Sequence, residues 1–304
     1  MVNSNKCSLV VTQVAARVCH PTLPVQGGLM GNYVTTWDGR AKLGIGLGGI
    51  KYNVRMGSPC FGWPETEYLE PGVSLKEEEG KLTTPSHQGP GAVAAAVQAV
   101  TCIGNSVTVV SGDAKGAVGV VTGKGRDTVL SHFSETDMVN LSIGDRVKIR
   151  AEGVGLRLEG FQGDVFNVSP GFMESLSPVV DDGVLTLPVA KEVPSHATGY
   201  GVGGSEAQRG YLCIQSTPPA LVKKLGLGDL RIGDLVALRD TLINYGKGYH
   251  RGAVTVGVVV FGASDVAGQG PGVMAIAASK EGKIKPNITR DANVAKYLKL
   301  EESV

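Results

Sequence analysis

A short polar stretch ahead of an apolar segment is where this sequence could most readily place chemistry. It carries an acid, an amide, a lysine, a tyrosine and a histidine: Asp240, Asn244, Lys247, Tyr249 and His250. Residues 253–261 are mostly apolar and predict a buried strand. Loops carried on a rigid sheet often hold functional side chains. We therefore expect His250 to be a metal ligand or a general base, or else a hydrogen-bonded histidine where a strand begins.

Two Gly-Pro-Gly turns, each preceded by glutamine, form a second feature. The first leads into AVAAAVQAV, whose spacing and alanine content predict a helix. The unpaired amides at the start of that helix would favour an anion, and His87 lies beside them in sequence. We predict that both turns contact substrate, together with two residues of the polar stretch. The predicted substrate-binding residues are Gly89, Gly91, Gly270, Gly272, Asn244 and Tyr249.

Further carboxylates and lysines complete the candidate site. Asp113 and Lys115 share a glycine-containing loop between two predicted strands, where aspartate is also common for structural reasons. Glu174 follows Ser169-Pro170, the start of a predicted short helix, so helix capping explains it equally well. The predicted metal ligands are His87, Asp113, Asp240 and Glu174. The predicted catalytic residues are His250, Lys247 and Lys115.

Several well-known motifs are absent from the sequence. It contains no GxSxG, HExxH, Walker A or zinc-finger spacing, which disfavours serine-elbow hydrolases, zincins and P-loop enzymes. Residues 44–49 match the letters of GxGxxG. A dinucleotide loop should follow a buried strand and open a helix, and the flanking residues fit neither requirement. We predict turns or a glycine-rich hairpin here, and no nucleotide cofactor.

Composition narrows the classes of partner. The chain has 304 residues, with 29 basic and 28 acidic side chains and a formal net charge of +1. This balance supplies no field that would attract nucleic acid or an anionic membrane. The five cysteines are scattered without a CxxC pair, and neither an export signal nor a membrane-spanning apolar run is visible. We expect a cytoplasmic protein, a homo-oligomer, with a small-molecule substrate or ligand.

The abundance of glycine and valine predicts the fold class. Forty-four glycines indicate many tight turns between short strands. We predict a mainly β (α+β) protein with barrel- or sandwich-like sheets and a few short helices. Its halves would be residues 1–160, with one helix near 91–103, and residues 161–304, tightly packed together or forming one continuous domain. Ile-Gly-Asp turns at 143 and 232 favour a pseudo-symmetric core, with a site where the halves meet.

Three longer runs resemble a known family. They are GDAKGAVGVVTGKG, NVSPGFMESLSPVVDDGVLTLPV and GDLVALRDTLINYGKGYHRGAVTVGVVVFG. They look like an uncharacterised bacterial and archaeal family, domain of unknown function number 4438, and the likeness covers nearly the whole chain without implying a reaction.

The order of these blocks is also remotely similar to the acetamidase/formamidase family. That resemblance implies a β-rich oligomeric amide hydrolase with a metal-associated site of acids and histidine. Glu174, Asp113 and His250 fall near the similar blocks, whereas the richer histidine segment of those amidases is not evident here.

Two functions follow as hypotheses. In the first, a divalent metal (Zn, Mn or Ca) held by histidine and carboxylates activates water to hydrolyse a small amide or cyclic amide. Lys115 or Lys247 would stabilise the oxyanion. In the second, the protein is a non-catalytic binder whose Gly-Pro-Gly turns hold a small anionic metabolite.

Overall fold

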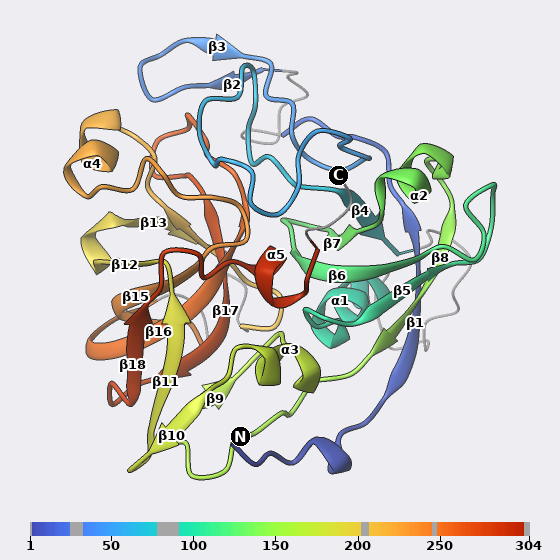
Figure 1. Cartoon of the computed structure of the whole chain (residues 1–304). Coiled ribbons are helices and arrows are strands. Elements are labelled where there is room, and N and C mark those ends of the chain that lie inside the picture. The colour runs from blue at the N-terminus through green and yellow to red at the C-terminus, as the bar shows by residue number, and fades with distance from the viewer. Residues whose placement is uncertain (1, 25–32, 78–90, 202–206, 245–247, 301–304) are drawn as a thin grey trace.

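Short valine-rich strands build most of the protein, which confirms the predicted mainly β class. The computed structural model describes residues 2–24, 33–77, 91–201, 207–244 and 248–300. In Figure 1 a closed barrel lies to the right, a larger sheet lies to the left, and a small hairpin crosses the top.

Six antiparallel strands close the barrel. In order around it they are β1 (Thr12–Val18), β4 (Val73–Lys76), β7 (Val129–His132), β6 (Val118–Lys124), β5 (Ser106–Val109) and β8 (Arg146–Ala151). In β8, exposed and buried residues alternate strictly, because successive side chains of a strand point to opposite faces. The inward set fills the barrel with a core of its own, built on residues such as Leu75, Val121, Phe133 and Ile149.

The larger sheet is organised around two strands that are buried on both faces. The sheet order is β12 (Lys191–Val193), β15 (Leu235–Leu242), β16 (Gly248–Phe261), β17 (Gly272–Ser279), β14 (Leu212–Ile214) and β13 (Thr198–Gly201), and β9 (Asp164–Val165) also pairs with β17. Every residue of β17 is buried, and so is every residue from 253 to 261 in β16. The apolar segment expected from the sequence is thus a central strand.

Smaller elements complete the fold. A three-stranded sheet has the order β10 (Val179–Asp181), β11 (Val184–Val189) and β18 (Ile284–Ile288), and the hairpin joins β2 (Val34–Thr35) to β3 (Ala41–Lys42). The helices found in the described residues are α1 (Gly91–Val100), α2 (Glu135–Asn140), α3 (Pro170–Ser175), α4 (Pro219–Lys224) and α5 (Val294–Tyr297). As expected, α3 begins at Ser169-Pro170: the Ser169 hydroxyl accepts from Phe172 N–H.

The two Ile-Gly-Asp turns share one local structure. Gly144 and Gly233 both have positive φ, and the aspartate that follows each accepts from a backbone N–H three residues earlier. One turn starts β8 of the barrel and the other starts β15 of the larger sheet. The barrel and the larger sheet have different strand orders. The two turns therefore repeat a local structure and do not belong to a pseudo-symmetric core.

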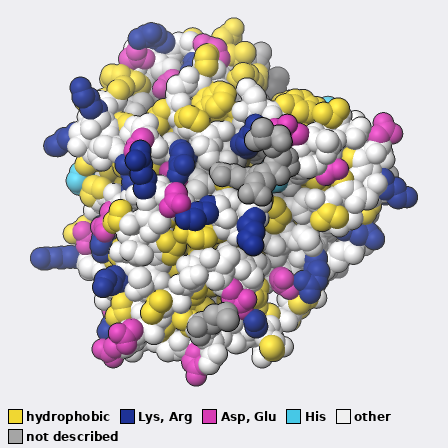
Figure 2. Space-filling model, in the orientation of Figure 1, with side chains coloured by type: hydrophobic (Ala, Val, Ile, Leu, Met, Phe, Trp, Pro, Cys, Tyr) yellow, Lys and Arg dark blue, Asp and Glu magenta, His cyan; other side chains and the backbone are white. Residues whose placement is uncertain are grey.

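The barrel and the sheets pack directly on one another. Gly123 of β6 lies against Val260 of β16, where a Cβ on the glycine would come within 2.6 Å of the valine side chain. The larger hydrophobic cluster draws residues from both ends of the chain, among them Val54, Leu130 and Val258. Basic and acidic side chains are interspersed on the face shown in Figure 2, in keeping with the small net charge. In the described part, no helix is both long and apolar enough to cross a membrane.

Candidate functional site

Four of the residues predicted for the site share one hairpin, β15–β16. Asp240 has a positive φ and lies where the register between β15 and β16 shifts. Its carboxylate accepts a 2.7 Å hydrogen bond from Gly252 N–H on the opposite strand. Asn244 donates to Asp164. Tyr249 is 70% exposed, and His250 follows it. Two buried atoms here, Asn244 Oδ1 and His250 Nδ1, have no hydrogen-bond partner among the described residues.

The other described candidates lie elsewhere. Asp113 and Lys115 are in the turn between β5 and β6, and Glu174 on α3 pairs with Lys6 at 2.7 Å. Strands β6 and β16 contact each other near Gly123 and Val260, towards the end of each strand. Asp113 precedes the start of β6, and His250 is close to the start of β16, so each lies away from this contact. Figure 1 accordingly shows the β5–β6 hairpin and the start of β16 on opposite sides of the molecule. The structure therefore does not bring these two residues together.

Three predicted residues, His87, Gly89 and Lys247, lie outside the described part of the chain. Within that part, no group of three or more histidine, cysteine, aspartate or glutamate side chains could hold a metal ion. The predicted metal set therefore has no common centre among Asp113, Asp240 and Glu174.

The Gly-Pro-Gly turns have packing reasons for their glycines. Gly91 is the first residue of α1, where a helix was expected. A Cβ on Gly270 would lie 1.9 Å from the Ile214 carbonyl oxygen, and one on Gly272 would lie 2.0 Å from the Phe261 ring. These contacts leave no room for a side chain at either position. Neither glycine lines the pocket described next.

The GxGxxG-like tract has a packing role as well. It lies between β3 and β4 and opens no helix. A Cβ on Gly46 would lie 2.2 Å from the Glu67 carbonyl oxygen, and Gly48 N–H donates to the carboxylate of buried Glu70. The glycines let this segment lie directly on residues 65–70, as isolated β-bridges and bends.

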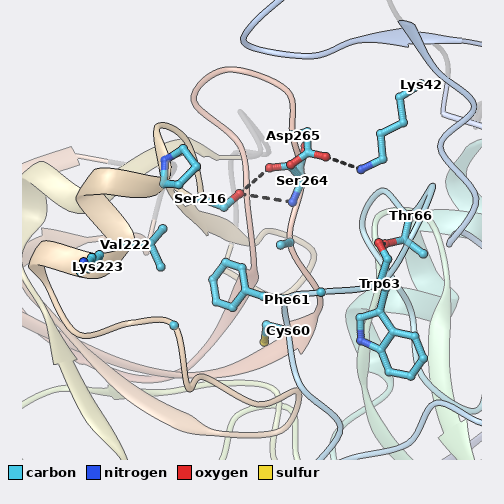
Figure 3. A pocket seen from close by; sticks show the side chains of 14 residues that line it. Lys42, Cys60, Phe61, Trp63, Thr66, Ser216, Val222, Lys223, Ser264 and Asp265 are labelled. Atoms are coloured by element: carbon cyan, nitrogen blue, oxygen red, sulfur yellow. Dashed lines mark hydrogen bonds and ion pairs between the residues drawn. The ribbon is translucent and has the colours of Figure 1, made fainter. Parts of the chain in front are cut away.

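A cavity of about 570 Å³ lies where the β2–β3 region meets α4 and the segment after β16 (Figure 3). We call it the serine pocket. Its lining residues are Lys42, Cys60, Phe61, Gly62, Trp63, Thr66, Ser216, Pro219, Val222, Lys223, Gly228, Ala263, Ser264 and Asp265. The wall is therefore mainly apolar and aromatic, with a few polar groups, which is the usual make-up of a small-molecule site.

Two serines form one side of the pocket. Ser216 Oγ donates to the Ser264 carbonyl and lies 3.0 Å from the Gln269 carbonyl. Both serines are buried. Gly270, from the second Gly-Pro-Gly turn, lies directly behind Ser216. No histidine occurs among the described residues that line the pocket, so neither serine has an imidazole base of the kind a nucleophilic serine needs.

An ion-pair network closes another side. Lys42 Nζ lies 2.5 Å from Asp265 Oδ2 and 3.1 Å from Glu67 Oε1. Burial by itself would lower the pKa of Lys42, but Asp265 and Glu67 outweigh burial and raise it. Glu67 is fully buried, and within the described part of the chain its Oε2 has no hydrogen-bond partner. The lysine is thus held in its charged form beside the cavity.

The one thiol of the pocket is not activated. Cys60 is fully buried, and desolvation raises the pKa of its thiol well above the ordinary value. It stays protonated at neutral pH and acts as a small apolar wall residue.

A group of cations and phenols lies behind the serine pocket. The Tyr68 hydroxyl donates to Gln269 Oε1 at 2.6 Å. The Arg126 guanidinium stacks 4.6 Å above the Tyr68 ring and hydrogen-bonds Tyr211. Lys124, fully buried, donates to Asn167 Oδ1 and to the Gln208 carbonyl. Desolvation lowers the pKa of Lys124 to about 8.

Sequence reasoning missed both the serine pocket and this group. The available signal for the pocket was the placement of Trp63 in a glycine-broken region without strand or helix periodicity.

Comparison with known proteins assigns nearly the whole chain to one protein family. Two family models match: "Domain of unknown function (DUF4438), N-terminal" over residues 33–174, and "Domain of unknown function (DUF4438), C-terminal" over residues 176–298. A solved structure described as "Crystal structure of TM1086" is similar at 35% sequence identity, with a TM-score of 0.85, over 97% of this chain and 99% of that one. No curated protein matches. These findings lend no support to a similarity with acetamidases. The family matches and the similar fold agree, and the chain belongs to the DUF4438 family.

Proposed function

We propose that the protein binds a small, carboxylate-bearing metabolite in the serine pocket. The observation that carries the proposal is the make-up of that cavity: an apolar and aromatic wall on which Lys42, Ser216, Ser264 and Asp265 converge (Figure 3). Its wall comes from both matched halves of the chain, since residues 42–66 belong to the first and residues 216–265 to the second. Ligand sites are often found at such junctions.

The size of the cavity suits a metabolite. Small-molecule sites enclose about 300–1,000 Å³, and this one has about 570 Å³. Phe61 and Trp63 offer ring surface to an apolar body. The Ser216 hydroxyl, whose proton is donated to the Ser264 carbonyl, offers a lone pair to a donor group of the ligand.

The charges favour an anionic group on the ligand. Lys223, at the end of α4, lines the pocket, and the described residues give it no acidic partner. Lys42 already has Asp265, which is half exposed and can turn away when another carboxylate replaces it. A ligand carboxylate would thus meet either the Lys223 ammonium, which is unpaired among the described residues, or the Lys42 ammonium, whose partner can be exchanged.

Thermal-shift measurement with a panel of small molecules tests this proposal. The panel would hold aromatic and aliphatic monocarboxylates and dicarboxylates, with amides and amines of the same carbon skeleton. A bound ligand raises the melting temperature in a saturable manner. We expect a carboxylate to do so and its matched amide or amine to fail.

Two neighbouring lysines provide a matched pair of variants. Lys223→Gln removes the unpaired ammonium of the pocket, whereas Lys224→Gln changes the next residue of α4, which does not line the cavity. We expect Lys223→Gln to weaken carboxylate binding about tenfold and Lys224→Gln to leave it unchanged. A panel in which no carboxylate stabilises the protein, or equal responses of the two variants, would contradict the proposal.

Metal-assisted hydrolysis of a small amide stays a second candidate. What favours it is the hairpin β15–β16, where Asn244 Oδ1 and His250 Nδ1 are buried without partners and could meet a ligand. Elemental analysis of the purified protein should then find a stoichiometric divalent metal. His250→Ala should remove that metal with little change in melting temperature. Protein without metal, or a large loss of stability in the variant, would favour a structural role for His250. The predicted homo-oligomer can be checked in the same sample by light scattering.

A further inference from the structure

We propose that Arg126, with Tyr211 and Tyr200, forms a second ligand site, which binds an oxyanion group such as phosphate or carboxylate. It lies beyond the end of β6, where that strand meets the larger sheet. None of these three residues lines the serine pocket.

The guanidinium of Arg126 rests on a rigid aromatic platform. It lies 4.6 Å above the centre of the Tyr68 ring and hydrogen-bonds Tyr211. Both tyrosine rings in turn pack edge-on against Phe261, with centroid distances of 5.9 and 4.9 Å. The cation therefore has a fixed position, which is what a site needs if binding is not to cost much ordering of side chains.

The positive charge at this place is not balanced by the described residues. Burial raises the pKa of Tyr68 to about 12 and that of Tyr211 further, so both phenols are neutral at pH 7. Asp127 acts on Arg126 and is exposed to solvent. The buried Glu70 carboxylate lies against Gly125 but accepts its hydrogen bonds from Gly48, Ser74 and Thr128. No described carboxylate forms a salt bridge with Arg126.

Lys124 adds a second positive charge near Arg126. Lys124 precedes Arg126 by two residues, is fully buried, and bonds only to neutral acceptors, Asn167 Oδ1 and the Gln208 carbonyl. Neither cation makes a salt bridge with a described residue, and a cation without one is costly to bury, so a bound anion would offset that cost.

The geometry also selects the class of ligand. A guanidinium offers five donors in one plane, which match two oxygens of a carboxylate or phosphate. The Tyr68 ring covers one face of Arg126, so a ligand would approach the edge of the fork. Tyr200 is 52% exposed and close enough to Tyr211 to influence its pKa, so it marks the solvent side of the site.

Titration with inorganic phosphate, followed by thermal shift, tests the site on the full chain. Sodium chloride at equal ionic strength serves as the salt control, and sodium acetate tests a carboxylate as the source of the oxyanion. We expect saturable stabilisation by phosphate, acetate or both, beyond the effect of chloride. Responses to phosphate and acetate that equal the response to chloride would overturn the proposal.

Variants then locate the effect. Arg126→Gln should weaken the oxyanion response at least tenfold, while Arg146→Gln, an exposed arginine on the barrel strand β8, should leave it unchanged. Lys224→Gln, on α4 and outside both sites, should leave it unchanged as well. An undiminished response in Arg126→Gln would overturn the proposal.

If Arg126→Gln does not fold, two milder changes decide. Arg126→Lys keeps the charge and loses the fork, and Tyr211→Phe keeps the ring and loses the hydroxyl. Both should weaken the oxyanion response in folded protein, as judged by circular dichroism. Wild-type responses in both variants would count against the site.

Discussion

Lys42 and Asp265 are 223 residues apart in sequence, yet Lys42 Nζ lies 2.5 Å from Asp265 Oδ2. The same ammonium lies 3.1 Å from Oε1 of the fully buried Glu67. This network ties the β2–β3 hairpin to the segment that follows β16, and it forms one wall of the serine pocket. Its members should therefore be important for stability as well as for the shape of the pocket.

Lys42→Met should lower the free energy of unfolding substantially. The substitution leaves the Glu67 carboxylate buried without its cation, a loss that typically costs about 3 kcal/mol or more. Urea denaturation gives the value. Lys296→Met is the control, because it removes an exposed pair with Asp291 and should change stability by less than about 1 kcal/mol. Similar small effects of both substitutions would mean that the buried pair stabilises the fold no more than an exposed one.

Lys124 should make stability depend on alkaline pH. Its pKa is lowered by burial from 10.5 in the unfolded chain to about 8 in the folded protein. Between these values the unfolded state binds more protons. The contribution of Lys124 to the free energy of unfolding therefore rises with pH in that window, by at most about 1.4 kcal/mol per pH unit.

Lys124→Met should flatten this dependence. Urea denaturation at several pH values from 7.5 to 10.5 measures it for wild type and variant. Lys148→Met on β8, where the lysine is exposed, should follow the wild-type curve. A variant Lys124→Met with the same pH dependence as wild type would show that the lysine titrates normally.

Glycines of similar sequence context should respond in opposite ways to alanine. At Gly272 a Cβ would lie 2.0 Å from the Phe261 ring, so Gly272→Ala should destabilise the protein by about 2 kcal/mol or more. At Gly171, inside α3, no atom lies within 4 Å of the added Cβ. Gly171→Ala should therefore stabilise by about 0.5–1 kcal/mol through helix propensity. Chemical denaturation checks both, and equal changes would contradict the packing role of Gly272.

Much of the fold could be predicted because its signals are local. Alternating burial in β8, the Gly-Asp turns before β8 and β15, and the capped start of α3 at Ser169 all depend on residues a few positions apart. The unbroken apolar run 253–261 likewise indicated a buried strand. In each case the local sequence pattern and the tertiary environment favour the same structure.

The candidate site could not be predicted in this way. The serine pocket joins Lys42, Trp63, Ser216 and Asp265, and no local pattern links residues so far apart. The Gly-Pro-Gly turn at 270–272 looked like a ligand loop, because the Phe261 ring that requires Gly272 is not its neighbour in sequence. Similarly, only the folded chain shows that Arg126 faces neutral phenols.

Thiol reactivity gives a test of the serine pocket that needs no ligand. Cys7 is exposed and should react quickly with Ellman's reagent, and Cys7→Ser should remove that fast phase. Cys19 should be slower, since burial raises the pKa of its thiol. Cys60, Cys102 and Cys213 are buried and should react only on unfolding. Of these three, Cys60 alone lines the serine pocket, but it is 2% exposed and its thiol is protonated at neutral pH. Mass spectrometry identifies which cysteine is labelled. A thiol reacts only when it is deprotonated and accessible to the reagent. Fast labelling of Cys60 in the folded protein would therefore show that the pocket opens much more widely than its walls indicate.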